Sequence, residues 1–283
     1  MVITANRAPT FAVWIALCVL GFVYPSTAAA QGDLKRARTL YNSGQYDQAI
    51  EAATPLRGRP DLGPSATLII ARSRLERFRR QSDPQELAAA RQELLSLTPR
   101  SLAEQEAIEW QIGLGTALFL EDQVGPAAEM FRAVIPSARP LLPLPQFEKL
   151  LEWWGTTMSR LAESLVGDAR KQAYEKFRSD ARLELERNPL SSSATYWMIV
   201  AARGAGDFDG AWSAAVAGWI RVGRQPDGRQ LRTEIEVFVG QTLIPERAQA
   251  RTGQRLDAKP TIAEIGALNE EWRAVTTRWS GEV

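Results

Sequence analysis

Residues 40–50 read LYNSGQYDQAI, and their spaced glycine, aromatic residue and alanine return in GDFDGA at residues 206–211. In each copy we expect the glycine to end one helix and the aromatic residue to begin the next, because glycine readily adopts the left-handed conformation that terminates helices. The alanine one turn later allows two helices to approach closely. Recurrence of this unit predicts stacked helical hairpins, in which the repeated positions are structural.

The rest of the chain after residue 30 also has the composition of helices. It is rich in Ala, Leu, Glu, Arg and Gln, and apolar residues such as Leu68, Ala71, Leu75 and Phe78 recur at helical spacing. Breakers joined to capping residues, as in residues 82–84, separate the segments. We therefore predict one helical domain over residues 31–283, with helices at 33–43, 46–56, 64–79, 84–97, 101–120, 124–135, 145–166, 168–187, 191–204, 208–222, 228–251 and 261–279.

A proline cluster, PSARPLLPLP at residues 136–145, is predicted to interrupt the helical stack. It would act as a stiff connector or present an extended ligand to the groove of a partner. We place no domain boundary there, because the amphipathic helices on both sides each need the apolar face of the other.

A run of arginines lies between the apolar positions of the helix predicted at residues 64–79. The surrounding charge is nearly neutral, so a solvated helix face is predicted, and an anion-binding patch is the alternative. The run comprises Arg72, Arg74, Arg77, Arg79 and Arg80.

The first thirty residues have the order of a secretory signal peptide. Arg7 precedes an apolar run at residues 11–23, and the small residues 28–30 follow. This order predicts a signal peptide over residues 1–30, cleaved after Ala30, and hence a periplasmic or secreted protein whose mature form does not span a membrane. An uncleaved anchor is the alternative, although the run is shorter than the ~20 residues that a spanning helix needs.

Composition narrows the chemistry that the mature chain can perform. The sequence has no histidine, and its single cysteine, Cys18, lies in the predicted signal peptide. Ser-His-Asp and Cys-His hydrolases, zinc sites and haem ligation are therefore not expected. The 34 Lys and Arg against 33 Asp and Glu offer no bulk attraction for nucleic acid. We predict no cofactor, no metal and no catalytic residue.

At the repeated residues the chain resembles the tetratricopeptide repeat (TPR) family. The signature alanines lie 78 and 84 residues apart, whereas the family period is about 34 residues, so other hairpins must intervene at residues 64–97 and 145–187. The resemblance implies an all-α fold, a right-handed α-solenoid of helical hairpins. The matches are Leu40, Gly44, Tyr46 and Ala49 in the first copy; Leu114, Gly115, Leu118, Ala127 and Phe131, with Val124 at the aromatic position, in the second; and Gly206, Phe208 and Ala211 in the third.

In that family the first helix of each hairpin lines a concave groove that takes extended peptides or partner helices. The resemblance therefore implies a non-catalytic exported scaffold that binds a protein or peptide partner in the cell envelope. Tyrosine and arginine suit such a surface, although aromatic residues at helical spacing also occur in cores. The implied groove residues are Arg38, Tyr41 and Asn42 in the first copy, Glu109, Thr116 and Phe119 in the second, and Tyr196, Val200 and Arg203 in the third.

The alternative function is a glycan- or peptidoglycan-directed binding protein or enzyme. Tryptophans are abundant in the second half of the chain. The adjacent Trp153 and Trp154 cannot both face inward on one helix, so one of them is expected to be partly exposed or wedged between hairpins. Glu163-Ser164 resembles the glutamate-serine pair of lytic transglycosylases, but the Gly-Leu-Met-Gln segment that follows in those enzymes is missing here.

Overall fold

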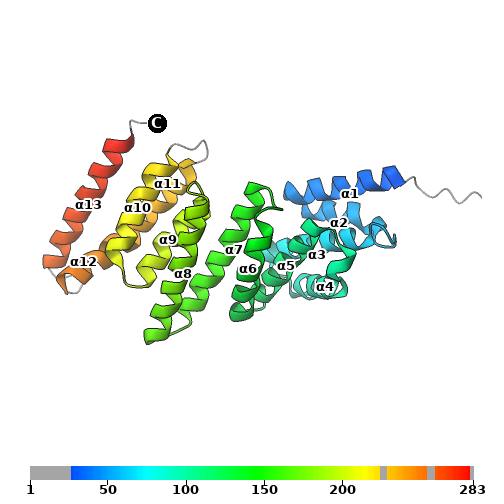
Figure 1. The fold of residues 1–283 in the computed structure, drawn as a ribbon, viewed down its shortest axis with the longest axis horizontal. Coiled ribbons are helices and arrows are strands. Elements are labelled where there is room, and N and C mark those ends of the chain that lie inside the picture. Colours follow the sequence, from blue (N-terminus) through cyan, green and yellow to red (C-terminus); the bar gives the residue numbers. More distant parts are fainter. Residues whose placement is uncertain (1–26, 224–227, 254–258, 281–283) are drawn as a thin grey trace, which may run out of the picture.

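The computed structural model describes residues 27–223, 228–253 and 259–280, and every element within these ranges is a helix (Figure 1). The predicted all-helical class is confirmed. Except for residues 27–30, the predicted signal peptide lies outside the described residues. The α-helices are α1 (Thr27–Asn42), α2 (Tyr46–Ala53), α3 (Gly63–Gln81), α4 (Pro84–Ser96), α5 (Glu104–Leu120), α6 (Val124–Ala138), α7 (Leu144–Glu163), α8 (Gly167–Arg187), α9 (Ser192–Gly204), α10 (Phe208–Val222), α11 (Gly228–Phe238), α12 (Ile244–Thr252) and α13 (Lys259–Ser280).

Consecutive helices pack against one another, and the pairs follow in order from α1 at one end of an elongated body to α13 at the other (Figure 1). The odd-numbered helices also contact each other in series, from α1 through α3, α5, α7 and α9 to α11. Among the even-numbered helices of the described chain, only α10 and α12 make comparable contact. The odd-numbered helices therefore form one closely spaced layer, whose solvent side we call the odd-helix face.

Three turns between helices share the same backbone geometry, with positive φ angles of 76° at Gly44, 63° at Asp122 and 81° at Gly206. After each turn the next backbone N–H donates to the carbonyl five residues earlier, at 2.9 to 3.0 Å, which is the Schellman arrangement. The repeated hairpin is thus a shared turn geometry, although the second copy has no glycine in its turn. The alanines that follow these turns, Ala49, Ala127 and Ala211, are each 0% exposed, as a close helix approach requires.

The proline cluster does not interrupt the stack, and that prediction is wrong. Helix α6 continues through Pro136 to Ala138, so this proline removes one backbone hydrogen bond without ending the helix. The chain then reverses within residues 139–143, where Leu142 is buried, and α7 packs directly on α6. The helical stack is therefore continuous from α6 to α7, although the chain between them is not helical.

One long helix was predicted over residues 228–251, and the structure divides it into α11, a π-helical turn (Val239–Leu243) and α12. Pro245 lacks an N–H, and its ring would collide with the carbonyl four residues earlier. The wider π turn just before this proline, in which Ile244 N–H donates to Val239, accommodates it.

The buried side chains form a succession of apolar clusters along the stack. One joins α1 to α3, a second joins α3 to α5, and a larger one with Phe131, Trp154 and Phe177 joins α5 to α9. The last cluster, with Trp212 and Trp219, joins α9 to α13. None of the described helices is long and apolar enough to cross a membrane.

Candidate functional site

A cavity of about 370 Å³ lies on the N-terminal part of the odd-helix face, and we call it the α1–α7 cavity. Helices α1, α2, α3, α5 and α7 and the connector before α7 supply its walls, so it exists only where several hairpins meet. Its size falls within the range of ligand pockets in proteins. Its walls combine the rings of Tyr41, Tyr46 and Trp153, the apolar residues Leu75, Ile112, Leu142, Pro143, Pro145 and Leu150, Gly113, and the polar residues Asn42, Arg72, Glu76, Glu109, Thr116, Gln146 and Lys149.

Each aromatic ring of the cavity carries an arginine of α3. The guanidinium carbon of Arg72 lies 4.5 Å from the ring centre of Tyr41, and that of Arg80 lies 4.5 Å from the ring centre of Tyr46. Arg79 lies 4.8 Å from the ring centre of Trp153. Cations over aromatic faces are attracted by the ring quadrupole. One helix therefore holds the rings of three other helices in place.

The prediction of a solvated face is wrong for Arg72, Arg74 and Arg77 of α3, which are partly buried, whereas Arg79 and Arg80 at the end of the helix are exposed. The side chain of Arg72 is only 18% exposed, and Arg74 and Arg77 reach the carboxylates of Glu86 and Glu93 on α4. Five arginines along one helix are spread around its circumference, so they meet acidic groups on the helices at either side. The burial of these ion pairs depends on how the neighbouring helices pack, so the sequence pattern of α3 did not indicate it.

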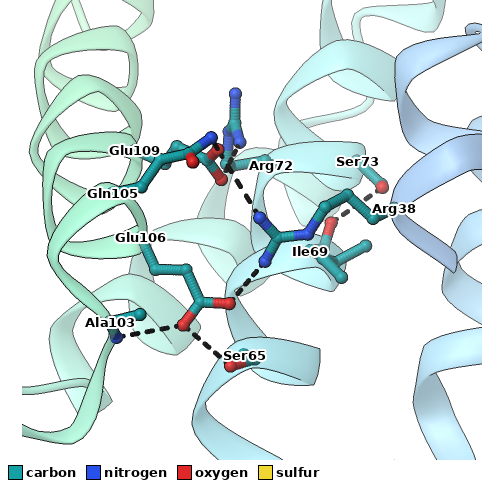
Figure 2. Close-up of polar contacts among 9 residues, drawn as sticks. All are labelled: Arg38, Ser65, Ile69, Arg72, Ser73, Ala103, Gln105, Glu106 and Glu109. Carbon is teal, nitrogen blue, oxygen red and sulfur yellow. Dashed lines mark hydrogen bonds and ion pairs between the residues drawn. The ribbon is translucent and has the colours of Figure 1, made fainter. Parts of the chain in front are cut away.

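A polar cluster behind the cavity ties α1, α3 and α5 together (Figure 2). Arg72 donates to Glu109 at 2.6 Å, and Arg38 donates to Glu106 while its other terminal nitrogen lies 3.8 Å from Glu109. Ser65 Oγ donates to Glu106 at 2.8 Å. Both glutamates are buried, at 7% and 5% exposure. Removing either cation would leave a buried carboxylate undercompensated, so the cluster fixes the spacing of the three helices.

The two phenols and the guanidinium of the cavity keep their usual protonation states near neutral pH. Burial raises the pKa of Tyr41, with Arg72 opposing, and burial followed by the charge of Glu76 raises the pKa of Tyr46. For Arg72, burial disfavours the charge, but Tyr41, Glu109 and Glu76 outweigh it and raise its pKa. The cavity therefore offers neutral phenols beside a permanent cation.

Of the nine groove residues that the resemblance implies, four line the α1–α7 cavity together. Arg38 lies behind the wall and binds Glu106. Phe119 lies at the margin, where its ring packs edge-on against Trp153 at 5.4 Å between centres. The hydroxyl of Thr116 donates a hydrogen bond to the Ile112 carbonyl of its own helix at 2.9 Å. The four cavity residues are Tyr41, Asn42, Glu109 and Thr116.

The other three residues lie on α9, away from the cavity. Tyr196 packs against Phe238 of α11 at 6.1 Å between ring centres, and Val200 is 8% exposed. Arg203 donates to both carboxylate oxygens of Glu246 on α12, with Nε at 2.7 Å. The structure thus places Tyr196 against α11 and Arg203 against α12. The part of all three residues in partner binding stays a prediction.

The other cavity residues were not identified as groove residues from the sequence, among them Tyr46, Glu76, Lys149 and Trp153. Signals for two of them were present. Glu76 lies four residues after Arg72 and so shares its helix face. For the adjacent tryptophans, the expectation that one is partly exposed is confirmed, because Trp154 is 1% exposed while Trp153 reaches the cavity. Lys149 had no such signal, since its place depends on how α7 meets α3.

Glu163 and the two aspartates at the start of α10 are engaged in hydrogen bonds and ion pairs within the protein. Glu163 is exposed at the end of α7 and accepts a hydrogen bond from Ser159 at 3.1 Å. Asp207 caps α10 and pairs with Arg178, and Asp209 pairs with Arg247. In the part of the chain that the structure describes, no acidic group of three or more is arranged to hold a metal ion.

No protein-family model matches this chain, and neither a curated protein nor a solved structure does. The likeness to TPR proteins therefore stays an expectation drawn from the repeated residues.

Proposed function

We propose that this protein is a non-catalytic scaffold of the cell envelope, a right-handed TPR-like α-solenoid that binds a protein or peptide along its odd-helix face. The α1–α7 cavity is the observation that carries this proposal. It combines three anchored aromatic rings with paired charges, and aromatic residues and arginine dominate the binding energy of protein interfaces. No cofactor enters the proposal.

The proposed location in the cell envelope depends on export, and export is predicted from the signal-peptide pattern of residues 1–30. Mass spectrometry of the protein made in a bacterial host should find Gln31 as the first residue. Cleavage there removes the first turn of α1, whose Ala30 is 2% exposed against the first core cluster. Recovery of intact Met1 in the membrane fraction would contradict export by cleavage.

Site-specific photocrosslinking tests the binding face directly. A photoreactive residue replaces Asn42 or Gln146 at the cavity, and the matched control replaces Leu95 of α4, which is 60% exposed away from the cavity. We expect adducts of defined mass from the two cavity positions in the native envelope and none from Leu95. Adducts that form equally at all three positions would exclude the odd-helix face as the binding surface.

Glycan binding is the second candidate, because Trp153 is an indole at the wall of a partly polar cavity. Sugars need an open ring face. Trp153 already contacts Arg79 at 4.8 Å, Phe119 at 5.4 Å and the nearly parallel ring of Phe131 at 6.2 Å. This coverage favours a peptide. Cosedimentation with purified peptidoglycan that is lost in Trp153→Ala, together with an absence of protein adducts, would favour the glycan instead.

A further inference from the structure

The mouth of the α1–α7 cavity carries more positive than negative charge. Arg79 and Lys149 pair there with the carboxylate of Glu76, and Arg80 lies over the ring of Tyr46. Glu76 accepts from Arg79 at 2.7 Å and from Lys149 at the longer distance of 3.4 Å. Arg80 has no carboxylate partner among the described residues. These three cations outnumber the carboxylates beside them, which are Glu76 and, next to Trp153, Glu152.

The same cations are accessible from solvent. The side chains of Arg79 and Lys149 are 42% and 49% exposed, whereas that of Glu76 is only 10% exposed. An incoming group thus meets the ammonium and guanidinium groups before it meets the carboxylate. The phenol of Tyr46 lies in the field of Glu76, Lys149 and Arg80, and its raised pKa keeps it a neutral hydrogen-bond donor at this mouth.

The cations are also held in position before any partner arrives. Arg79 and Arg80 lie over the rings of Trp153 and Tyr46, so their rotamers are constrained by contact with walls of the cavity. Preorganised donors lose less conformational entropy on binding than free surface side chains do.

Further along α7 the charge reverses. Burial and the nearby charges of Glu148 and Glu234 raise the pKa of Glu152, while Lys149 and Arg79 oppose. Glu148 accepts a hydrogen bond from the Ser193 N–H at the start of α9 at 2.9 Å, and Glu234 lies on α11. These carboxylates repel an acidic segment, so the attractive end of the face is the one formed by α2, α3 and the start of α7.

We propose that the α1–α7 cavity takes an acidic peptide segment, with an aromatic or aliphatic side chain in the cavity and an adjacent Asp or Glu side chain on Lys149 and Arg80. The proposal rests on the function proposed above and names the chemical class of the partner. Charge complementarity at the mouth and the aromatic walls behind it select this occupant.

Selection from a phage library of random peptides, fused to the phage at their C-termini, tests this inference because it offers side-chain carboxylates and no free peptide C-terminus. The bait is the full chain. We expect selected peptides enriched in Asp or Glu next to an apolar residue. The exposed double variant Arg80→Gln/Lys149→Gln should lose the acidic enrichment, whereas the control Lys171→Gln/Arg182→Gln on α8 should keep it. All baits are first compared by circular dichroism.

A selected peptide labelled with fluorescein then allows the dissociation constant of each variant to be measured. The Arg80→Gln/Lys149→Gln variant should bind it roughly fivefold more weakly, as expected for two solvent-exposed pairs. The difference should shrink between about 50 mM and about 500 mM salt, because salt screens exposed charges.

The outcomes separate the inference from the proposed function. Enriched peptides that are neutral or basic, or acidic peptides that bind the double variant equally well, would overturn the acidic partner and leave peptide binding standing. Failure to enrich any peptide would overturn both. Enrichment that survives both Trp153→Ala and the cavity-filling Thr116→Leu would move binding away from the cavity and overturn the inference.

Discussion

Between α1 and α5, arginines pair with buried glutamates, whereas between α9 and α13 the carboxylate partners of arginines are more exposed and two arginines lie on indole rings. Arg72 donates to Glu109 at the first end. At the second end, Arg247 lies 4.4 Å and Arg232 lies 3.9 Å from the ring centres of Trp212 and Trp219, respectively. The ion pairs are directional and hold helices at a set spacing, while the indoles fill the space between helices.

This difference accounts for where the face stays open. The α1–α7 cavity lies among the ion-paired helices. On α9, by contrast, Tyr196 packs against Phe238 and Arg203 is paired with Glu246. Large rings exclude water and bring neighbouring helices into contact, so the C-terminal end gains packing at the expense of accessible surface.

Removing an indole at the C-terminal end should have the largest effect. Trp212 is 5% exposed and packs edge-on against Trp272 at 5.7 Å between ring centres. Trp212→Ala should lower the free energy of unfolding by about 3 to 5 kcal/mol, through lost burial and the cavity left behind. Denaturant unfolding in low and high salt measures the loss, which should not change with salt. Trp279→Ala, at a partly exposed site, is the control with a smaller loss.

Breaking an ion pair at the N-terminal end should cost somewhat less. Glu109→Gln leaves the buried guanidinium of Arg72 without its carboxylate and should cost about 3 kcal/mol. The control Glu129→Gln removes the exposed pair with Arg132 and should change stability by less than about 0.5 kcal/mol. The double change Arg72→Met/Glu109→Leu should recover much of the loss. Equal losses in Glu109→Gln and Glu129→Gln would show that the N-terminal end does not depend on buried charge.

Crowding a repeated alanine tests the shared hairpin packing. Ala211 is 0% exposed, so Ala211→Leu should force the helices apart and cost about 1 to 3 kcal/mol. Ala250→Leu, at an exposed position of α12, is the matched control and should be nearly neutral. Thermal melting compares the two variants, and an unchanged melting curve for Ala211→Leu would exclude close packing at this hairpin.

The smallest effects should come from the turns. Gly206 has a φ of 81° and no atom within 4 Å of an added Cβ, so Gly206→Ala isolates backbone strain and should cost about 1 kcal/mol. Asp122 has the same backbone with a side chain, so Asp122→Gly should stabilise by up to about 1 kcal/mol. Its exposed ion pair with Arg160 contributes little. Calorimetry that finds the same sign for both changes would contradict a shared turn.

The repeated hairpin followed from local sequence. Helix ends at Gly44 and Gly206, the alanines one turn later and the spacing of apolar residues all depend on neighbours within a few residues of the chain. The local sequence therefore predicted the helices and the buried Ala49 and Ala211. Asp122 escaped the pattern because aspartate adopts the left-handed conformation less often than glycine does. The π turn escaped because it reflects the local response to Pro245.

The sequence by itself determined a helical hairpin array and the buried alanines that follow its turns, because both depend on short-range patterns. Only the tertiary structure decided which of the inferred groove residues share a site. Tyr41 and Glu109 meet in the α1–α7 cavity, while Tyr196 and Arg203 contact α11 and α12. The reason is physical: partners such as Glu76 and Lys149, 73 residues apart, meet through helix packing that no local pattern encodes.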